Sequence, residues 1–351
     1  MKKALACLAA MVMTVSFLGG CGSQTETAKT DSASTEPAAA ESAAPADDTA
    51  SEAPAADNAS EAPAAESTGS HKFGFSVPTM NNPFFLSIHD AAKATIEGNG
   101  DTFVAGDPQM DPQKQISQIE DMLTQGIDIM VLCPIDSASI KAALTACADK
   151  NVPVIIYDTP VHDPELVITT VASDNRNAGA VVAKDMKGKL PEGSKVAIMH
   201  SPAAQACVER VEGFIAESDG YFNIIGDYDG QGDTGVTMPI AEDVLQGNPD
   251  LGAFFCVNDP SAIGCVQALE SAGRTGEVLV YGVDGAPEAK HAIKDGTMSG
   301  TGAQSPVNLG KIAVESAYKH LNGESLEKDT VVDTFIINTE NIDQYDLDGW
   351  Q

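Results

Sequence analysis

Residues 252–284 read GAFFCVNDPSAIGCVQALESAGRTGEVLVYGVD, and this stretch indicates how the folded part of the chain is built. Two apolar runs, 252–257 and 278–283, are typical of buried strands, and residues 262–271 between them have a helical pattern. Asp284 directly follows the second run. A strand, a helix and a second strand in this order predict parallel strands covered by helices.

The same alternation extends over residues 72–337. We predict further strands at 72–77, 102–105, 127–133, 152–157, 166–171, 195–199 and 223–226, and further helices near 175–187, 204–217, 238–246 and 287–294. Asn82-Pro83 and Asp111-Pro112 each resemble a helix N-cap followed by proline at the first helical position. Two such runs in tandem predict an α/β protein with two doubly wound parallel sheets, which suits the length of residues 71–351.

The N-terminus has the features of an export signal. Lys2 and Lys3 precede an apolar run, 4–18, that is too short to span a membrane, so we predict a signal peptide over residues 1–20. Leu18-Gly19-Gly20-Cys21 resembles the lipobox of bacterial lipoproteins. That resemblance implies diacylation of the Cys21 thiol and anchoring of the protein to the cell membrane on its extracytoplasmic face. The alternative is a plain secretory signal with an incidental cysteine.

Residues 22–70 consist almost entirely of Ala, Ser, Thr, Pro, Glu and Asp. Such a composition buries too little apolar surface to offset the entropy of ordering. With Cys21, this segment is therefore predicted to form a lipidated, disordered acidic tether over 21–70, which holds the folded part away from the membrane.

Charge and motif content exclude several classes of function. Residues 71–351 contain 41 acidic and 17 basic side chains, a net charge of −24, which argues against nucleic-acid binding. Their five cysteines form no CxxC motif, and Cys133 and Cys256 lie in apolar runs where cysteine packs as a small hydrophobe. The chain has no HExxH, GxSxG or P-loop motif, so neither an enzyme nor a cofactor is predicted.

Polar residues follow the predicted strands in both halves. Asn82, Asp158, Asn258-Asp259, Asp284 and Gln304 each come directly or shortly after an apolar or glycine-rich run. Ligands of open parallel sheets bind beyond the carboxyl ends of the strands. Each residue alone is more typical of a helix cap than of a ligand contact, but their equivalent positions together favour a shared cleft between the two halves.

Several motifs together resemble the type I periplasmic sugar-binding proteins of ABC transporters, with the ribose-binding proteins as the nearest group. They are Asn81-Asn82-Pro83-Phe84-Phe85, Ala172-Ser173-Asp174-Asn175, Glu212-Gly213-Phe214, Val257-Asn258-Asp259 and Gly282-Val283-Asp284-Gly285. The resemblance covers residues 72–340. It implies two lobes joined by three crossings, near Ser173-Asp174, Gln304-Ser305 and Asp333-Thr334. The N-terminal lobe would be 71–173 plus 305–333, and the C-terminal lobe 174–304 plus 334–351.

The resemblance also implies a set of ligand-binding residues. They are Asn82, Phe84, Phe85, Asp158, Asn258, Asp284 and Gln304. The carboxylates and amides suit sugar hydroxyls, and the two phenylalanines offer flat apolar faces to a sugar ring or, alternatively, fill the core.

Other positions depart from the family pattern. Thr159 and Val208 stand where the ribose-binding pattern has arginines, so the resemblance places both at the ligand site. Gly232 replaces an aromatic residue, and Pro78 replaces a small polar one. A pocket without two cationic donors suits a neutral polyol or a ligand that carries an amine.

The loop 227–235, DYDGQGDTG, has three interpretations. Its GxGxxG spacing resembles a nucleotide site, but Pro239 follows closely and no ribose-binding acid is well placed. Its aspartates resemble a calcium loop but lack the EF-hand spacing. We favour a cleft loop in which Gln231 or Asp233 reaches the ligand.

The predicted function is therefore capture of a sugar or sugar-like small molecule by closure of two lobes, followed by delivery to an ABC transporter permease. We expect a monomer. The alternative is a receptor that presents its sugar to a chemoreceptor or sensor kinase without transport. A sugar-responsive repressor of the same fold is disfavoured, because a signal peptide and a tether occupy the place of its DNA-binding helices.

Overall fold

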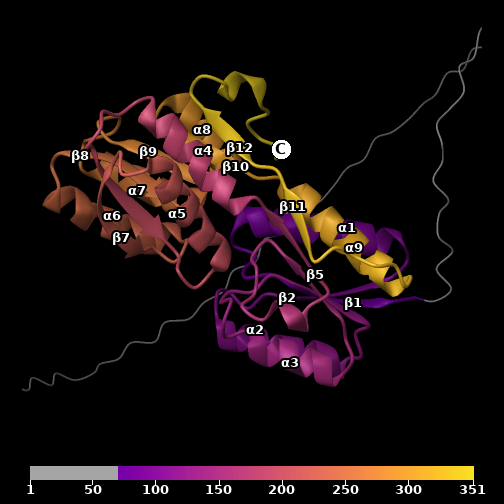
Figure 1. Cartoon of the computed structure of the whole chain (residues 1–351). Helices are drawn as coiled ribbons and strands as arrows, with labels where there is room; N and C mark the ends of the chain where they lie inside the picture. The colour runs from indigo at the N-terminus through magenta and orange to yellow at the C-terminus, as the bar shows by residue number, and fades with distance from the viewer. Residues whose placement is uncertain (1–69) are drawn as a thin grey trace, which may run out of the picture. The chain divides into compact units, whose positions relative to one another are not determined.

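Residues 70–351, the part of the chain that the computed structural model describes, contain two six-stranded sheets (Figure 1). The first has the order β11-β5-β4-β3-β1-β2, and all its neighbours are parallel. Its strands are β1 (Lys72–Ser76), β2 (Thr102–Gly106), β3 (Ile129–Leu132), β4 (Val154–Tyr157), β5 (Thr169–Ser173) and β11 (Asp329–Val332). The predicted signal peptide, Cys21 and all but the last residue of the tether lie outside the described residues.

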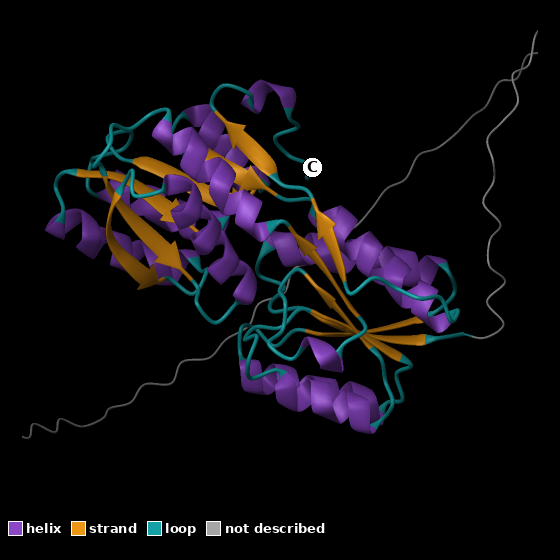
Figure 2. Ribbon diagram, viewed as in Figure 1, coloured by secondary structure: helices purple, strands orange, loops and turns teal. Residues whose placement is uncertain are grey.

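The second sheet has the order β12-β10-β9-β8-β6-β7 and is parallel except for β12, which runs antiparallel to β10. Its strands are β6 (Lys195–His200), β7 (Asn223–Asp229), β8 (Leu251–Cys256), β9 (Leu279–Asp284), β10 (Gly300–Ala303) and β12 (Phe335–Asn338). The alternation of strand and helix in sequence therefore produces two open sheets (Figure 2).

Helices cover both sheets. The first sheet packs with α1 (Pro83–Gly98), α2 (Pro112–Thr124), α3 (Lys141–Asp149) and α9 (Pro306–Leu321), and we call this assembly lobe 1. The second packs with α4 (Asn175–Lys187), α5 (Gln205–Ser218), α6 (Thr234–Gly247), α7 (Asp259–Ser271) and α8 (Pro287–Asp295), and we call it lobe 2. Short 3-10 turns occur at Pro164–Leu166 and Ile342–Gln344. No helix within residues 70–351 is long and apolar enough to cross a bilayer.

Each sheet buries both of its faces. In lobe 1, Val131 and Ile155 pack into the same cluster as residues of α1 and α9, whereas Met130 and Ile156 pack with residues of α2 and α3. Successive side chains of a strand point to opposite faces, so a run of apolar residues is required where helices cover both. This arrangement confirms the predicted doubly wound α/β class.

The chain passes between the lobes three times, after β5, after β10 and after β11. Two of these passages are bonded to each other. The Asp174 N–H donates to the Val332 carbonyl at 2.8 Å, and the Thr334 hydroxyl donates to the Asp174 carbonyl at 3.0 Å. The Asn177 side chain also donates to the Thr334 carbonyl at 2.8 Å, so the passages after β5 and after β11 are held side by side.

Several element boundaries differ from the sequence prediction, and two of these differences have a clear local cause. Residues 166–171 were predicted as a strand, but β5 begins only at Thr169, because the preceding residues form the 3-10 turn that starts at Pro164. Helix α6 begins at Thr234 rather than near 238. The Asp233 side chain accepts the Val236 N–H at 3.0 Å and caps the helix, so Pro239 lies inside it.

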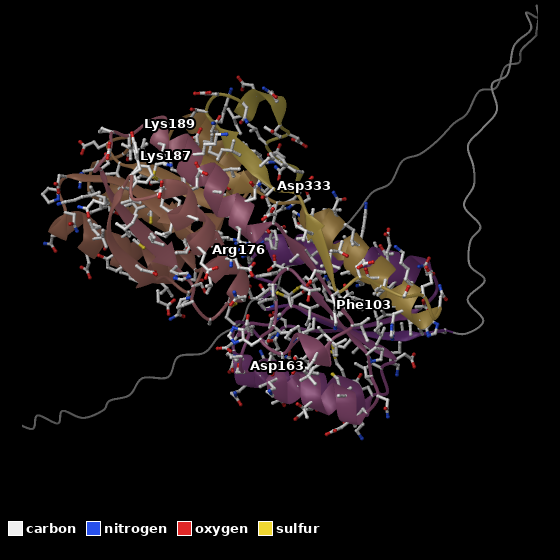
Figure 3. The ribbon with its side chains drawn as sticks, viewed as in Figure 1. Phe103, Asp163, Arg176, Lys187, Lys189 and Asp333 are labelled. Carbon is white, nitrogen blue, oxygen red and sulfur yellow. The ribbon has the colours of Figure 1, made fainter. Side chains whose placement is uncertain are left out.

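Two glycines allow helices α4 and α5 to touch. A Cβ atom on Gly179 would lie 1.9 Å from the Arg210 carbonyl oxygen, and one on Gly213 would lie 1.9 Å from the carbonyl oxygen of Arg176. Arg176, labelled in Figure 3, also forms an ion pair with Glu212 of the facing helix. This close approach fixes the position of α5, the helix that carries Arg210.

Candidate functional site

A cavity of about 440 Å³ is lined by residues of both lobes, at the carboxyl ends of their strands. Eight of the ten residues predicted to bind ligand line it: Asn82, Phe84, Phe85, Asp158, Thr159, Gln231, Asn258 and Asp284. Pro78 and Gly232, where the sequence departs from the family pattern, also line it. Residues remote in sequence therefore meet at one place, as the strand topology requires.

Two predicted residues do not line the cavity. Val208 lies on α5 beside it, but the face of α5 that points inward carries Cys207 and Arg210, which are three residues apart. Gln304 is fully buried behind Asp284 and donates its Nε2–H to the Asp284 Oδ1 atom at 2.7 Å. Gln304 thus holds Asp284, a cavity residue, in place. On α5, the arginine that faces the cavity is Arg210.

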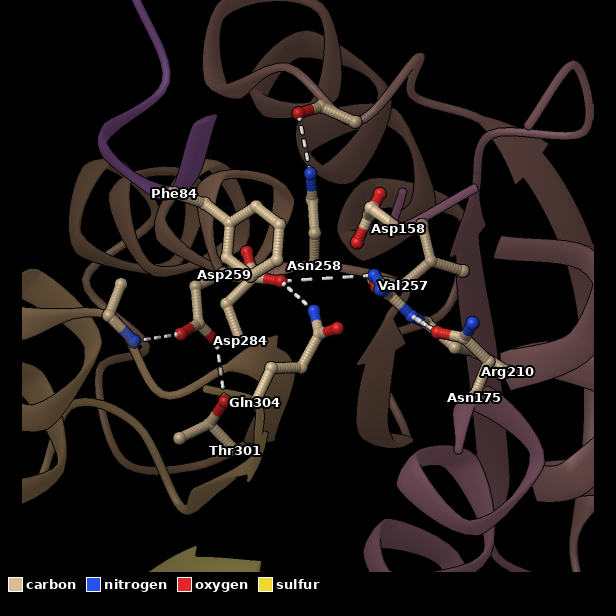
Figure 4. Close-up of polar contacts among 12 residues, drawn as sticks. Phe84, Asp158, Asn175, Arg210, Val257, Asn258, Asp259, Asp284, Thr301 and Gln304 are labelled. Carbon is tan, nitrogen blue, oxygen red and sulfur yellow. Dashed lines mark hydrogen bonds and ion pairs between the residues drawn. The ribbon is translucent and has the colours of Figure 1, made fainter. Parts of the chain in front are cut away.

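Arg210 is a cavity-lining side chain that the sequence analysis did not predict. It is buried, and its Nε donates to the Asn175 Oδ1 at 2.9 Å while its Nη1 donates to the Val257 carbonyl at 2.8 Å (Figure 4). Nη1 also lies 3.8 Å from the Asp284 Oδ1. The available signal was the i, i+3 spacing from Cys207, which places both side chains on one helical face.

Asp158 follows β4 and is 4% exposed. Its Oδ2 accepts the Thr159 hydroxyl at 2.9 Å and lies 3.7 Å from the Cys133 Sγ, whereas its Oδ1 has no hydrogen-bond partner among the described residues. Burial raises the pKa of the Asp158 carboxyl, and the Arg210 guanidinium opposes the rise. The side chain therefore presents an unsatisfied acceptor inside the cavity.

Asp284 is the last residue of β9 and faces Asp158 from the other lobe. Burial and the neighbouring Asp259 carboxyl raise the pKa of Asp284 well above its usual value, against the effect of Arg210. Asp259 lies behind it, accepting the Thr301 hydroxyl at 2.7 Å and the Ala286 N–H at 2.8 Å. Burial raises the pKa of Asp259 to about 6 despite these donors. One guanidinium thus faces several buried carboxyl groups.

Two of the three cavity-lining asparagines, Asn82 and Asn258, cap helices and retain capacity for a ligand. Asn82 Oδ1 accepts the Phe84 N–H at 2.9 Å at the start of α1, and Asn258 Oδ1 accepts the Ser261 N–H at 3.0 Å at the start of α7. Each asparagine can therefore cap its helix and still bind a ligand, because an amide has more donors and acceptors than one cap uses. Phe84 is buried in the core of lobe 1 and packs edge-on against Phe85, with ring centroids 5.4 Å apart.

The loop between β7 and α6 folds against Asn258. The Asn258 Nδ2 donates to the Gly232 carbonyl at 2.8 Å, and a Cβ on Gly232 would lie 2.9 Å from that nitrogen. Gly232 has φ of +67°, so a side chain here would be both strained and crowded. The aromatic residue expected at this position by the family pattern has no room, and Gln231 and Asp233 line the cavity instead.

Strained backbone conformations concentrate around the cavity. Of the seven non-glycine residues with positive φ between 70 and 351, five line it: Gln109, Met110, Asp158, Gln231 and Asp284. Such conformations cost of order 1–3 kcal/mol each and cluster at ligand sites. The strain therefore marks the cavity as functional independently of its chemistry.

Ser137 bonds the two lobes directly across the cleft. It lies after β3 in lobe 1, and its N–H donates to the Ala203 carbonyl of lobe 2 at 3.0 Å. Its hydroxyl oxygen accepts the Gln205 N–H at 3.0 Å, at the first residue of α5. The N-cap residue of α5 is Ala204, which has no side-chain acceptor. Lobe 1 therefore supplies the cap of a lobe 2 helix.

The C-terminal residues also contact both lobes. Lys290 of α8 donates to the carbonyl oxygens of Asp346 and Gly349, and Tyr345 packs against the core of lobe 2. Trp350 packs against the core of lobe 1, edge-on to Phe84 with ring centroids 5.9 Å apart. Residues 334–351 were predicted to belong wholly to the C-terminal lobe, but their last residues also support a cavity wall of lobe 1.

The chemistry of this cavity is recognition of a polar molecule. Its lining, all within the described part of the chain, combines carboxylates, amides, one guanidinium and two aromatic rings and contains no histidine. Ser201 lines it, but the adjacent His200 directs its Nδ1 to Asp227, 3.1 Å from both carboxylate oxygens. Convergent polar groups with ring faces from two lobes match a small-molecule binding site.

Comparisons with known proteins give a consistent result. A family model described as a periplasmic binding protein domain matches residues 73–325. The ribose import binding protein RbsB of Bacillus subtilis (strain 168) is 36% identical over 256 residues, 73% of this chain and 83% of the relative, and that of Escherichia coli (strain K12) is 33% identical over 74% and 88%.

A solved structure gives the same relationship. It is a solute-binding protein of an ABC transporter from Mycobacterium smegmatis with bound glycerol, which is 30% identical with a TM-score of 0.74 and covers 79% of this chain and 96% of that one.

Proposed function

This chain belongs to the periplasmic binding protein family, and from that membership we propose that it captures a sugar or polyol outside the cytoplasm and delivers it to an ABC transporter permease. The observation that carries the proposal is the cavity of about 440 Å³ lined by both lobes, with Asp158 on one side and Asp284 and Arg210 on the other. The relatives named above are import and transporter proteins, so we do not propose the sensing alternative.

Binding is coupled to lobe closure in this proposal. A ligand that contacts both lobes binds the closed form better and shifts the population towards it. The three passages between the lobes serve as hinges, with lobe 1 comprising 71–173 plus 305–333 and lobe 2 comprising 174–304 plus 334–351. Asn82, Phe84, Phe85, Asp158, Thr159, Gln231, Asn258 and Asp284 contact the ligand together with Arg210. Gln304 acts through Asp284.

Residues 1–70 support a membrane anchor. We propose that the chain is cleaved before Cys21, is lipidated on that thiol and acts as a monomer at the extracytoplasmic face of the membrane. Incorporation of labelled palmitate by the wild-type chain but not by Cys21→Ser would support the anchor, and equal labelling would contradict it. Light scattering of the purified protein measures its molar mass, and a mass above that of one chain would contradict the proposed monomer.

The transport function is tested by calorimetric titration of the full chain, purified in detergent and freed of ligand by unfolding and refolding. The panel contains pentoses, hexoses, polyols, amino sugars and nucleosides. We expect at least one sugar or polyol to bind, and Asp284→Ala to abolish that binding while the variant still unfolds cooperatively. A panel in which only nucleosides bind, or nothing binds, would refute the proposed ligand class.

A further inference from the structure

We infer that the cavity selects a ligand that carries a protonated amine as well as hydroxyl groups, and that the amine binds beside Asp158. This inference rests on the proposed function, because it names the class of sugar-like molecule that the same cavity takes. It depends on three features of the cavity: its balance of charges, the occupation of Arg210, and the free oxygen of Asp158.

The charges that line the cavity do not balance. Four carboxyl groups line it, those of Asp158, Asp233, Asp284 and Glu288, and Arg210 is the single cation among the lining residues, all of which belong to the described part of the chain. A cleft lined by one sign of charge concentrates small ions of the opposite sign. Sugar acids and sugar phosphates are therefore disfavoured, and cations are favoured.

Arg210 forms no hydrogen bond or ion pair with Asp158. Its Nε and Nη1 already donate to Asn175 and Val257, and its nearest carboxylate is Asp284, 3.8 Å away. No ion pair joins Asp158 to any cation within residues 70–351. Thr159, at the position where the family pattern has an arginine, contributes a neutral hydroxyl donor in its place. The local charge of Asp158 thus remains without a direct partner.

The free Oδ1 atom of Asp158 is where a ligand donor fits. Asp158 lines the cavity, is 4% exposed, and its Oδ1 is the one carboxylate oxygen in the cavity lining that is both buried and without a hydrogen-bond partner in the described residues. A hydroxyl would satisfy that atom but would leave the carboxylate charge buried and uncompensated, which is costly. An ammonium group supplies both a donor and the missing charge, and such charge-assisted bonds are about twice as strong as neutral ones.

The groups around Asp158 set its response to pH. The titratable or charged side chains facing it are Cys133 after β3, Tyr157 on β4, Arg210 on α5 and Asp284 at the end of β9, with Cys207 beside Arg210. Only Arg210 is cationic. Burial raises the pKa of Asp158, so its carboxylate takes up a proton as the pH falls. The preference for an amine is therefore expected to weaken in acid, while an alkylamine on the ligand stays protonated.

Matched ligand pairs test the inference with the full chain in detergent. Each pair exchanges one hydroxyl for an amine: sorbitol and 1-amino-1-deoxysorbitol, glucose and glucosamine, galactose and galactosamine, with the N-acetyl sugars as uncharged versions of the amines. At pH 7 we expect the amine of the best-binding pair to bind at least tenfold more tightly than its hydroxyl partner. N-acetylation should remove that advantage, and lowering the pH should reduce it as the Asp158 carboxylate takes up a proton.

Two variants localise the effect. Asp158→Asn should bring the amine-to-hydroxyl affinity ratio to within about twofold of one. Glu288→Gln, which removes an exposed carboxylate of the lining on α8, should leave the ratio within about twofold of wild type. If Asp158→Asn fails to fold, the pH dependence of the wild-type ratio decides.

The possible failures are distinguishable. A hydroxyl ligand that binds as tightly as its amine partner, or a ratio unchanged by Asp158→Asn, would overturn the inference while leaving the proposed function intact. Absence of binding by every pair and by the wider panel would overturn both.

Discussion

The hydroxyl of Ser137 gives the clearest test of closure, because it contacts lobe 2 and lies outside the cavity lining. Ser137→Ala removes the acceptor of the Gln205 N–H at the start of α5 but keeps the backbone bond from residue 137 to Ala203. Loss of a helix N-cap costs about 1 kcal/mol. The bond joins the two lobes, so this cost falls on the closed form alone.

The expected effect on affinity follows directly. A loss of about 1 kcal/mol lowers the ratio of closed to open protein about fivefold, because 1.4 kcal/mol corresponds to a factor of ten. If the ligand-free protein is mainly open, the dissociation constant rises by the same factor. Calorimetric titration of wild type and Ser137→Ala with one ligand measures this change.

The matched control is Ser139→Ala, since Ser139 is an exposed serine in the same segment and its side chain makes no bond to lobe 2 in the described structure. Its dissociation constant should stay within about 1.5-fold of wild type. Equal affinities of wild type and Ser137→Ala, or an equal loss in the two variants, would refute the reasoning that lobe 1 caps α5 when the cleft is closed.

Two further predictions concern stability. Gly179→Ala should reduce the free energy of unfolding by about 3 kcal/mol, because its Cβ would meet the Arg210 carbonyl at 1.9 Å and force α4 away from α5. Urea unfolding measures this loss, with Gly98→Ala as the control, because a Cβ at Gly98 meets nothing within 4 Å. Similar stabilities of the two variants would contradict the prediction. Burial raises the Asp259 pKa from 3.8 to about 6, so the folded state holds a proton that the unfolded state releases, and about 3 kcal/mol of stability is lost as the pH rises from 4 to 6. The difference in unfolding free energy between wild type and Asp259→Asn should fall across that window, and a constant difference would contradict the assignment.

Sequence reasoning predicted most of the fold because its signals are local. The apolar run that forms β4 must be a strand buried on both faces, and the Asn82 and Asp111 caps with their following prolines start α1 and α2 as predicted. Where two local signals competed, the prediction was less accurate. Pro239 suggested a late start for α6, but the Asp233 cap determined the actual start.

The candidate site was harder to predict at the level of single side chains. The strand ends placed Asp158 and Asp284 at the cavity, because topology alone brings such positions together. Position in the sequence does not specify which side of a helix points inward. Val208 was therefore predicted to bind the ligand, although Arg210 is the residue of α5 that faces the cavity. It also does not specify depth, and Gln304 lies behind Asp284 rather than beside it. Such distinctions depend on packing across two lobes.

Trp350 is the only tryptophan in the chain, and it packs against Phe84, a ring that forms part of the cavity wall. The residues just before it are held by lobe 2, whereas its indole packs on lobe 1. The protein consequently contains a single indole fluorophore, and it lies at the boundary between the two lobes. Its emission reports occupancy without a label, and Trp350→Phe provides the optical blank.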